Sequence, residues 1–304
     1  MPKTKTEAQL KAHIKEQIRF NSGKNLLANE EVNSLQLIEV TESLVETIRA
    51  MDNATEKRMI DYLTDESLQE FCRVNQYFSF DSKSVDALKG IYAQLNDNIR
   101  AMDVAPNQIT LKELSQQHYE RLCDWLVQTN AFAGTMYDNS RETIQPVACS
   151  EYAPDLQLAL LHIELETLQQ PILDIGCGRE LNLVNYLRDN GFEAYGIDRF
   201  ENNNPYYTKT DWLEYAYQPD FWGTVISNLG FSNHFVHHNL RVDGNFKVYA
   251  QKYMEILASL QVGGSFYYAP DLPFIEKHLG TFSYLHQNYN MDGYEFRASH
   301  ITKI

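Results

Sequence analysis

The chain has 304 residues, 43% of them hydrophobic and 12% aromatic, and its formal net charge is −15. This length suits one large domain or two moderate ones. Acidic residues outnumber basic residues in both halves, so the composition argues against nucleic acid and anionic membranes as partners and favours small molecules, basic ligands or proteins.

Residues 1–145 are predicted to form a helical domain. Apolar residues recur every fourth position over 10–18, and a broad apolar stripe covers 35–48. Asp81 is a suitable N-cap for the next helical pattern, and Thr110, with Glu113 as its capping-box partner, for the one after. The sequence leaves three roles open for this domain: a lid over a pocket, substrate selection, or formation of a homodimer.

The stretch 108–130 also invites comparison with a helix-turn-helix regulator. Such a module needs clustered bases to bind DNA, and Lys112 and Arg121 are the only two in this span. The comparison is therefore disfavoured.

Residues 146–304 show a different pattern, in which short apolar segments alternate with helical ones. A helix is expected after Pro154, and strands are expected at 172–175, 194–197, 223–227 and 265–268. Such alternation is typical of a parallel, doubly wound α/β sheet. Two last segments, 284–289 and 294–301, predict a closing hairpin.

The first of these strands leads into the most informative motif of the chain. It ends in Asp174, and Gly176 and Gly178 follow before a helical pattern begins near Leu181. Glycine tolerates positive φ and lets backbone N–H groups approach a ligand, which then also lies near a helix N-terminus. The motif therefore predicts a strand, a glycine turn that contacts a ligand, and a helix.

This Asp-Ile-Gly-Cys-Gly motif resembles that of the class I S-adenosylmethionine (SAM)-dependent methyltransferases. The resemblance covers about residues 150–304 and implies a Rossmann-like seven-stranded sheet, the closing antiparallel hairpin, and SAM as cofactor. It implies that Asp174 lies near the methionine ammonium, that Asp198 accepts the ribose hydroxyls, and that Asp211 lies toward the adenine. The full set of cofactor-binding residues it implies is Tyr152, Asp174, Gly176, Cys177, Gly178, Glu180, Asp198, Arg199, Asp211, Trp212, Ser227 and Asn228.

Glu180 departs from the family pattern, which often has a third glycine there. An acid at this place either contacts the cofactor ammonium or simply favours the start of a helix. The departure also leaves room for a degenerate site that binds SAM or its demethylated product, S-adenosylhomocysteine (SAH), as a sensor, or only supports a partner-binding scaffold.

A nicotinamide dinucleotide site is a further alternative, because two glycines followed by Asp198 suit an NAD-dependent oxidoreductase. However, the last glycine of that fingerprint falls on Leu181. A carboxylate directly before the turn, at Asp174, would also repel a pyrophosphate. The charges therefore favour SAM over NAD.

The methyl acceptor is less legible in the sequence. His234, His237 and His238 follow the third clear strand, where we expect a loop that faces the cofactor. His234 is nearest the strand and is the candidate general base; surface or capping roles are the alternative. No Asn-Pro-Pro-Tyr type motif stands there, so the resemblance does not extend to enzymes that methylate amino groups of DNA or glutamine side chains. We expect methyl transfer to a small molecule.

The remaining expectations concern location and metals. The four cysteines, Cys72, Cys123, Cys149 and Cys177, form no C-x-x-C pair, and no Cys/His spacing suits zinc. No apolar run reaches the roughly 18 residues of a membrane span. We therefore expect a cytoplasmic protein with reduced thiols, no membrane segment and no metal site.

Overall fold

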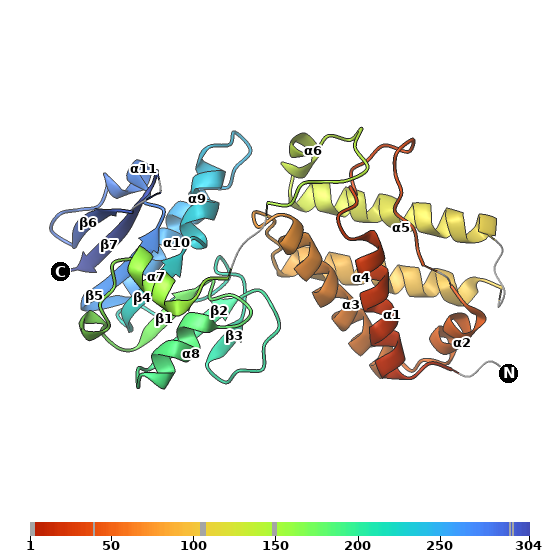
Figure 1. Ribbon diagram of the computed structural model, residues 1–304, viewed down its shortest axis with the longest axis horizontal. Helices are drawn as coiled ribbons and strands as arrows, with labels where there is room; N and C mark the ends of the chain where they lie inside the picture. The colour runs from red at the N-terminus through yellow and green to blue at the C-terminus, as the bar shows by residue number, and fades with distance from the viewer. Residues whose placement is uncertain (1–3, 39, 104–107, 148–150, 292, 294) are drawn as a thin grey trace. The chain divides into compact units, whose positions relative to one another are not determined.

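The computed structural model describes residues 4–38, 40–103, 108–147, 151–291, 293 and 295–304. The chain divides into two compact units, Met1–Cys149 and Ser150–Ile304 (Figure 1). In the described ranges, no helix is long and apolar enough to cross a bilayer. Cys72, Cys123 and Cys177 are free thiols, whereas Cys149 lies outside the described residues.

The first unit is helical. Its elements are α1 (Glu7–Asn21), α2 (Glu42–Ala50), α3 (Asn53–Val74), α4 (Ser82–Ala101), α5 (Gln108–Thr129) and the short α6 (Ala133–Met136). The predicted cap of α4 is confirmed, because the Asp81 carboxylate accepts the N–H of Ser84. In Figure 1 the long helices α1, α3, α4 and α5 lie alongside one another, and each packs on the next in that order.

Two expectations for this unit are wrong. The apolar stripe at 35–48 is helical only from Glu42, where the Thr41 hydroxyl caps α2. The N–H groups of Leu37 and Ile38 instead donate to side chains of α5 and α1, so their apolar side chains pack from a non-helical segment. Thr110 is not a cap, because α5 already begins at Gln108. Residues 108–129 form one uninterrupted helix without the turn of a helix-turn-helix.

The second unit contains one seven-stranded sheet. Its strands are β1 (Ile172–Ile175), β2 (Ala194–Asp198), β3 (Tyr207–Lys209), β4 (Trp222–Asn228), β5 (Leu260–Ala269), β6 (Tyr284–Asn290) and β7 (Arg297–Lys303). Their order is β3-β2-β1-β4-β5-β7-β6. The first five pair in parallel, and β7 pairs antiparallel with both β5 and β6. The predicted sheet and closing hairpin are confirmed, and the exposed three-residue β3 is an addition.

Helices cover both faces of this sheet. They are α7 (Pro154–Leu160), the 3-10 turn Leu165–Thr167, α8 (Asn182–Asp189), α9 (Phe231–Asn239), α10 (Phe246–Ser259) and α11 (Pro273–Glu276). Neighbouring residues of β1 belong to opposite cores: Leu173 packs with α9 and α10, and Ile172 packs with α7 and α8. This alternation follows from the two-residue period of a strand.

A buried polar cluster closes the antiparallel end of the sheet. Glu276 is 5% exposed, and its Oε1 accepts hydrogen bonds from the Tyr268 hydroxyl, the Ser299 hydroxyl and the Leu272 N–H. Each donor comes from a different segment, so one carboxylate holds β5, β7 and the start of α11 together.

The topology also fixes where a ligand would bind. β1 lies between β2 and β4. The strand order therefore reverses at β1: β2 and β3 extend the sheet on one side of it, and β4 and β5 extend it on the other. In open α/β sheets the crevice at such a switch point, beyond the carboxyl ends of the strands, is the usual ligand site. The residues that end β1, β2 and β4 therefore lie at the expected ligand site.

Candidate functional site

The glycine turn after β1 has the predicted conformation. Gly176 and Gly178 both have φ of +75°, which favours glycine. A Cβ on Gly176 would lie 3.1 Å from the indole ring of Trp212, so the close approach of that ring also requires a glycine. Helix α8 begins four residues after Gly178, preceded by Leu181 with a φ of 52°.

Asp174 lies in β1, two residues before the turn, and is 2% exposed. Among the described residues nothing hydrogen-bonds to its Oδ2. Burial, together with the nearby charge of Asp198, raises the pKa of Asp174 to about 8. A buried carboxyl without a partner is costly, so this position suits a cationic ligand group that would pair with the charged form.

Asp198 ends β2 and links the two strand ends. Its Oδ2 accepts the N–H of Gly178 at 3.0 Å, and its Oδ1 accepts the N–H of Arg199 at 2.7 Å. Asp198 is buried, and this burial raises the pKa of its carboxyl. Each carboxylate oxygen can accept a second hydrogen bond, so these contacts leave acceptor capacity for a ligand diol.

Glu151 was not identified from the sequence. Its two carboxylate oxygens accept the N–H groups of Arg179 and Glu180, at 2.7 and 3.2 Å. The carboxylate thus takes up backbone donors directly after the glycine turn. Because the partners lie 28 and 29 residues away, no local pattern could have revealed the contact.

Glu180 and Tyr152 both lie near the start of α8. The Glu180 side chain is exposed and precedes α8, whose first turn contains no acidic residue, so the expected role at the helix start is wrong. Its contact with an ammonium group stays a prediction. The backbone carbonyl of Tyr152 accepts hydrogen bonds from the amides of Gln157 and Asn182, which ties the start of α7 to α8.

Cys177 and Arg199 flank the acidic positions. The Cys177 thiol is buried, donates to the Gly178 carbonyl and packs so closely on Gly196 that a Cβ there would lie 2.7 Å from its sulfur. Burial raises the pKa of this thiol, which therefore stays protonated and serves packing. The guanidinium of Arg199 lies 5.5 Å from the Phe200 ring.

Two polar residues end β4: Ser227, whose hydroxyl is hydrogen-bonded within the fold, and Asn228, whose amide could bind a ligand. The Ser227 hydroxyl donates to the carbonyl of Ile175 and accepts the N–H of Phe231, so it joins β1 to the first turn of α9. Asn228 is different: both polar atoms of its amide are buried and have no partner among the described residues. Like the Asp174 carboxyl, this amide suits a polar ligand group.

Asp211 and Trp212 follow β3. The Asp211 carboxylate accepts the N–H of Leu213 and so holds a tight turn. That turn presents the Trp212 ring, which lies against Gly176 and meets the His234 ring edge-on at 4.8 Å.

The expectation that the three histidines lie in a loop is wrong. Residues 231–239 form α9, because the Ser227 hydroxyl accepts the Phe231 N–H and the helix starts directly after β4. His234 is 3% exposed, and its Nδ1 lies 3.5 Å from the Tyr249 hydroxyl. His238 stacks on Tyr249, and burial lowers the pKa of His238 to about 4. His237 also lies on this helix, and burial lowers its pKa. A catalytic role for His234 stays a prediction.

No cluster of three or more His, Cys, Asp and Glu residues that could hold a metal ion is present in the described parts of the chain. The polar groups that converge on the switch point are carboxyls and an amide. They suit an organic ligand with a positive charge and hydroxyl groups.

No protein-family model matches this chain, and no curated protein matches it. Solved structures do match it. A TehB-like SAM-dependent methyltransferase from Corynebacterium glutamicum is 17% identical over 44% of this chain and 79% of that chain, with a TM-score of 0.32. An rRNA methylase from Streptococcus thermophilus is 14% identical over 51% and 99%, with a TM-score of 0.34.

A third structure is the 16S rRNA N2 G1207 methyltransferase of T. thermophilus in complex with AdoMet and guanosine. It is 12% identical over 53% of this chain and 42% of that chain, with a TM-score of 0.33. The likeness concerns the fold of part of the chain. The strand order of the second unit is itself that of the seven-stranded sheet with a closing hairpin that we expected for this part of the chain.

Proposed function

We propose that this protein is a SAM-dependent methyltransferase that acts on a small molecule. The observation that carries the proposal is the buried Asp174 carboxyl, whose Oδ2 has no partner among the described residues, beside the glycine turn at the switch point of the sheet. SAM carries an ammonium and a sulfonium, so it would compensate this charge. The pyrophosphate of NAD would add negative charge at the same place.

The other strand ends fit the remaining parts of SAM. In this proposal Asp198 accepts the ribose hydroxyls through its remaining acceptor positions, and the Asn228 amide pairs with the amino-acid end of the cofactor. Gly176 and Gly178 permit close approach of the backbone. In the same proposal Asp211 and Trp212 are assigned to the adenine side.

Bound SAM would supply an activated methyl group. The residues of the chain would then mainly hold an acceptor in line with that group and exclude water, since positioning accounts for much of such a reaction. His234 is the base we propose for an acceptor that must lose a proton. Its ring is 3% exposed and lies against Trp212, so only an acceptor that reaches this helix face could use it.

The burial of His234 also favours a second candidate, a non-catalytic protein that binds SAM or SAH as a sensor or supports a partner-binding scaffold. Glu180, at the position of the missing glycine, is compatible with this reading. A small-molecule acceptor is favoured over nucleic acid because the net charge of −15 opposes phosphate binding.

The test is calorimetric titration of the full chain with SAM, SAH and NAD. Micromolar binding of SAM and SAH without NAD binding would support the proposal. NAD binding alone would replace it with an oxidoreductase, and no binding of any of them would refute it. An acceptor screen that detects SAH formation, with small molecules and rRNA as separate arms, would then distinguish the enzyme from the sensor.

A further inference from the structure

The helical unit contains a cavity of about 160 Å³ that none of the functions above uses. We propose that this cavity binds an uncharged aromatic molecule of about one ring that carries a single hydroxyl or N–H group. The site lies wholly in the first unit and is independent of the proposed cofactor site.

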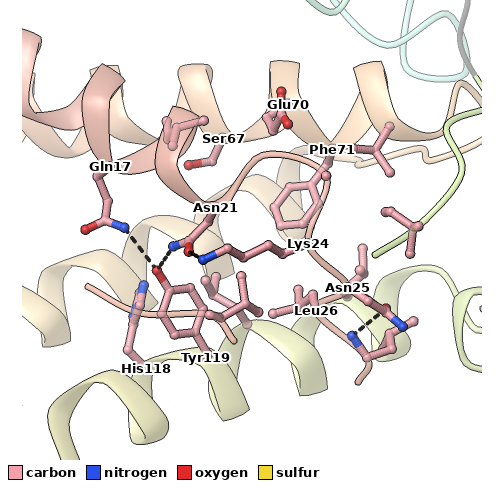
Figure 2. Close-up of a pocket in the computed structure, with 18 of the residues that line it drawn as sticks. Gln17, Asn21, Lys24, Asn25, Leu26, Ser67, Glu70, Phe71, His118 and Tyr119 are labelled. Carbon is pink, nitrogen blue, oxygen red and sulfur yellow. Dashed lines mark hydrogen bonds between the residues drawn. The ribbon is translucent and has the colours of Figure 1, made fainter. Parts of the chain in front are cut away.

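The walls of the cavity are mostly apolar. They come from α1, α3, α4 and α5 and from the segments 23–27 and 35–37 (Figure 2). Leu26, Leu35, Leu63, Phe71 and Ile144 line it and are only half-buried, so apolar surface is left uncovered around it. Its size is close to that of an engineered apolar cavity of about 150 Å³ that binds benzene. One aromatic ring is therefore the appropriate ligand size.

His118 supplies the polar group. It lies on α5, lines the cavity and is only 6% exposed (Figure 2). No described residue hydrogen-bonds to its ring, which contacts the rings of Tyr92 and Tyr119. Burial lowers the pKa of His118 to about 4, so the imidazole is neutral at pH 7 and offers one donor and one acceptor. A neutral imidazole that lines an apolar cavity can pair with one polar atom of a ligand there.

The other polar groups around the cavity are already paired. The hydroxyl of Tyr119 accepts hydrogen bonds from Gln17 and Asn21, and that of Tyr92 donates to Ser67 (Figure 2 labels all but Tyr92). This leaves His118 as the group that would bind the polar atom of a ligand.

The charges at the edge of the cavity are also satisfied. The Lys24 ammonium donates to the Asn21 side chain and the Ser34 carbonyl, and the Glu70 carboxylate accepts from Ser22 and Arg73. A charged group inside the mostly apolar walls would lose its hydration, which favours an uncharged ligand.

The test compares benzene, phenol and benzoate as ligands of the full chain, with dissociation constants measured by NMR titration. An apolar cavity without a polar group rejects phenol relative to benzene, because the hydroxyl is buried unpaired. With His118 as partner, phenol should bind at least as tightly as benzene, and benzoate should not bind measurably. In His118→Leu, which keeps a similar volume, phenol should bind at least tenfold more weakly than benzene.

His278→Leu is the matched control, because His278 is exposed and lies in the other unit. This variant should keep the phenol preference of the original chain. If His118→Leu does not fold, the signals of ¹⁵N-labelled histidine rings in the unmodified chain decide the question: phenol should shift those of His118 and leave those of His278 unchanged.

Three results would overturn the proposal: no binding of either neutral ring, a preference for benzene in the unmodified chain as strong as in the variant, or phenol binding that leaves the His118 signals unchanged. SAM binding of the His118→Leu variant should equal that of the unmodified chain. The phenol test therefore stands whether or not SAM binds.

Discussion

Replacing Asp174 with asparagine tests the central physical claim about the site. Folding raises the pKa of this carboxyl from 3.8 to about 8, so between these values the folded state holds a proton that the unfolded state releases. The free energy of unfolding therefore falls as pH rises between these values, by about 1.4 kcal/mol per pH unit, because unfolding releases this proton. At pH 7 the accumulated loss of unfolding free energy is roughly 4 kcal/mol. Asp174→Asn should not show this loss, because asparagine does not ionise.

The expected result is a variant whose stability advantage over the unmodified chain grows with pH from about 5 to 8. Urea unfolding can be followed through Trp212 and Trp222 in a Trp125→Phe background, which restricts the signal to the second unit. Asp189→Asn is the control, since Asp189 is exposed on neighbouring α8 and should give no such trend. An advantage that stays constant with pH would refute the reasoning.

The same carboxyl connects stability to the proposed cofactor. If a cation pairs with ionised Asp174, SAM binding at pH 7 should release about 0.9 proton, because a group with a pKa of about 8 is mostly protonated there. Calorimetry in two buffers with different ionisation enthalpies measures this release. Asp174→Asn should abolish the release and weaken binding. Proton-neutral SAM binding by the unmodified chain would contradict the pairing.

Three further changes have defined outcomes. Asp198→Ala should weaken SAM binding about tenfold to a hundredfold, because it removes the charged acceptor of the ribose hydroxyls. Calorimetric titration measures the affinity, and an unchanged circular dichroism spectrum shows that the variant is folded. Normal affinity would mean that the cofactor binds elsewhere. Gly176→Ala should cost more in unfolding free energy than Gly191→Ala, since both have positive φ but only Gly176 has a ring within 3.1 Å of the added Cβ; equal costs would show that Trp212 yields. Glu276→Ala should cost about 3 kcal/mol of unfolding free energy, because it leaves several buried donors without an acceptor; a loss below ~1 kcal/mol would mean that the cluster is not structural.

The sequence predicted those features that local pattern determines. Each of β1, β2, β4 and β5 contains a short apolar segment, and the glycines after β1 have positive φ, so the sheet and its turn could be anticipated. β3 could not, because its three residues are largely exposed and are placed by pairing with β2.

Other features depend on contacts between distant residues. Glu151 reaches a turn 28 residues away, and the hydroxyl of Ser227 turns a supposed histidine loop into α9. The apolar stripe before α2 packs well without being helical, because side chains of α1 and α5 hold its backbone. His118 was not singled out, since a lone histidine in a helix becomes noteworthy only when its neighbours leave it without a partner.

The acids around the glycine turn have one more consequence, for the end of a reaction cycle. The charges of Asp198 and Glu151 act on the same small region as Asp174. If methyl transfer occurs there, the bound cofactor loses its sulfonium charge and becomes a neutral thioether, so its attraction to these carboxyls falls at the moment of reaction. The product keeps its ammonium and its ribose hydroxyls, so SAH should bind at the same place as SAM but more weakly.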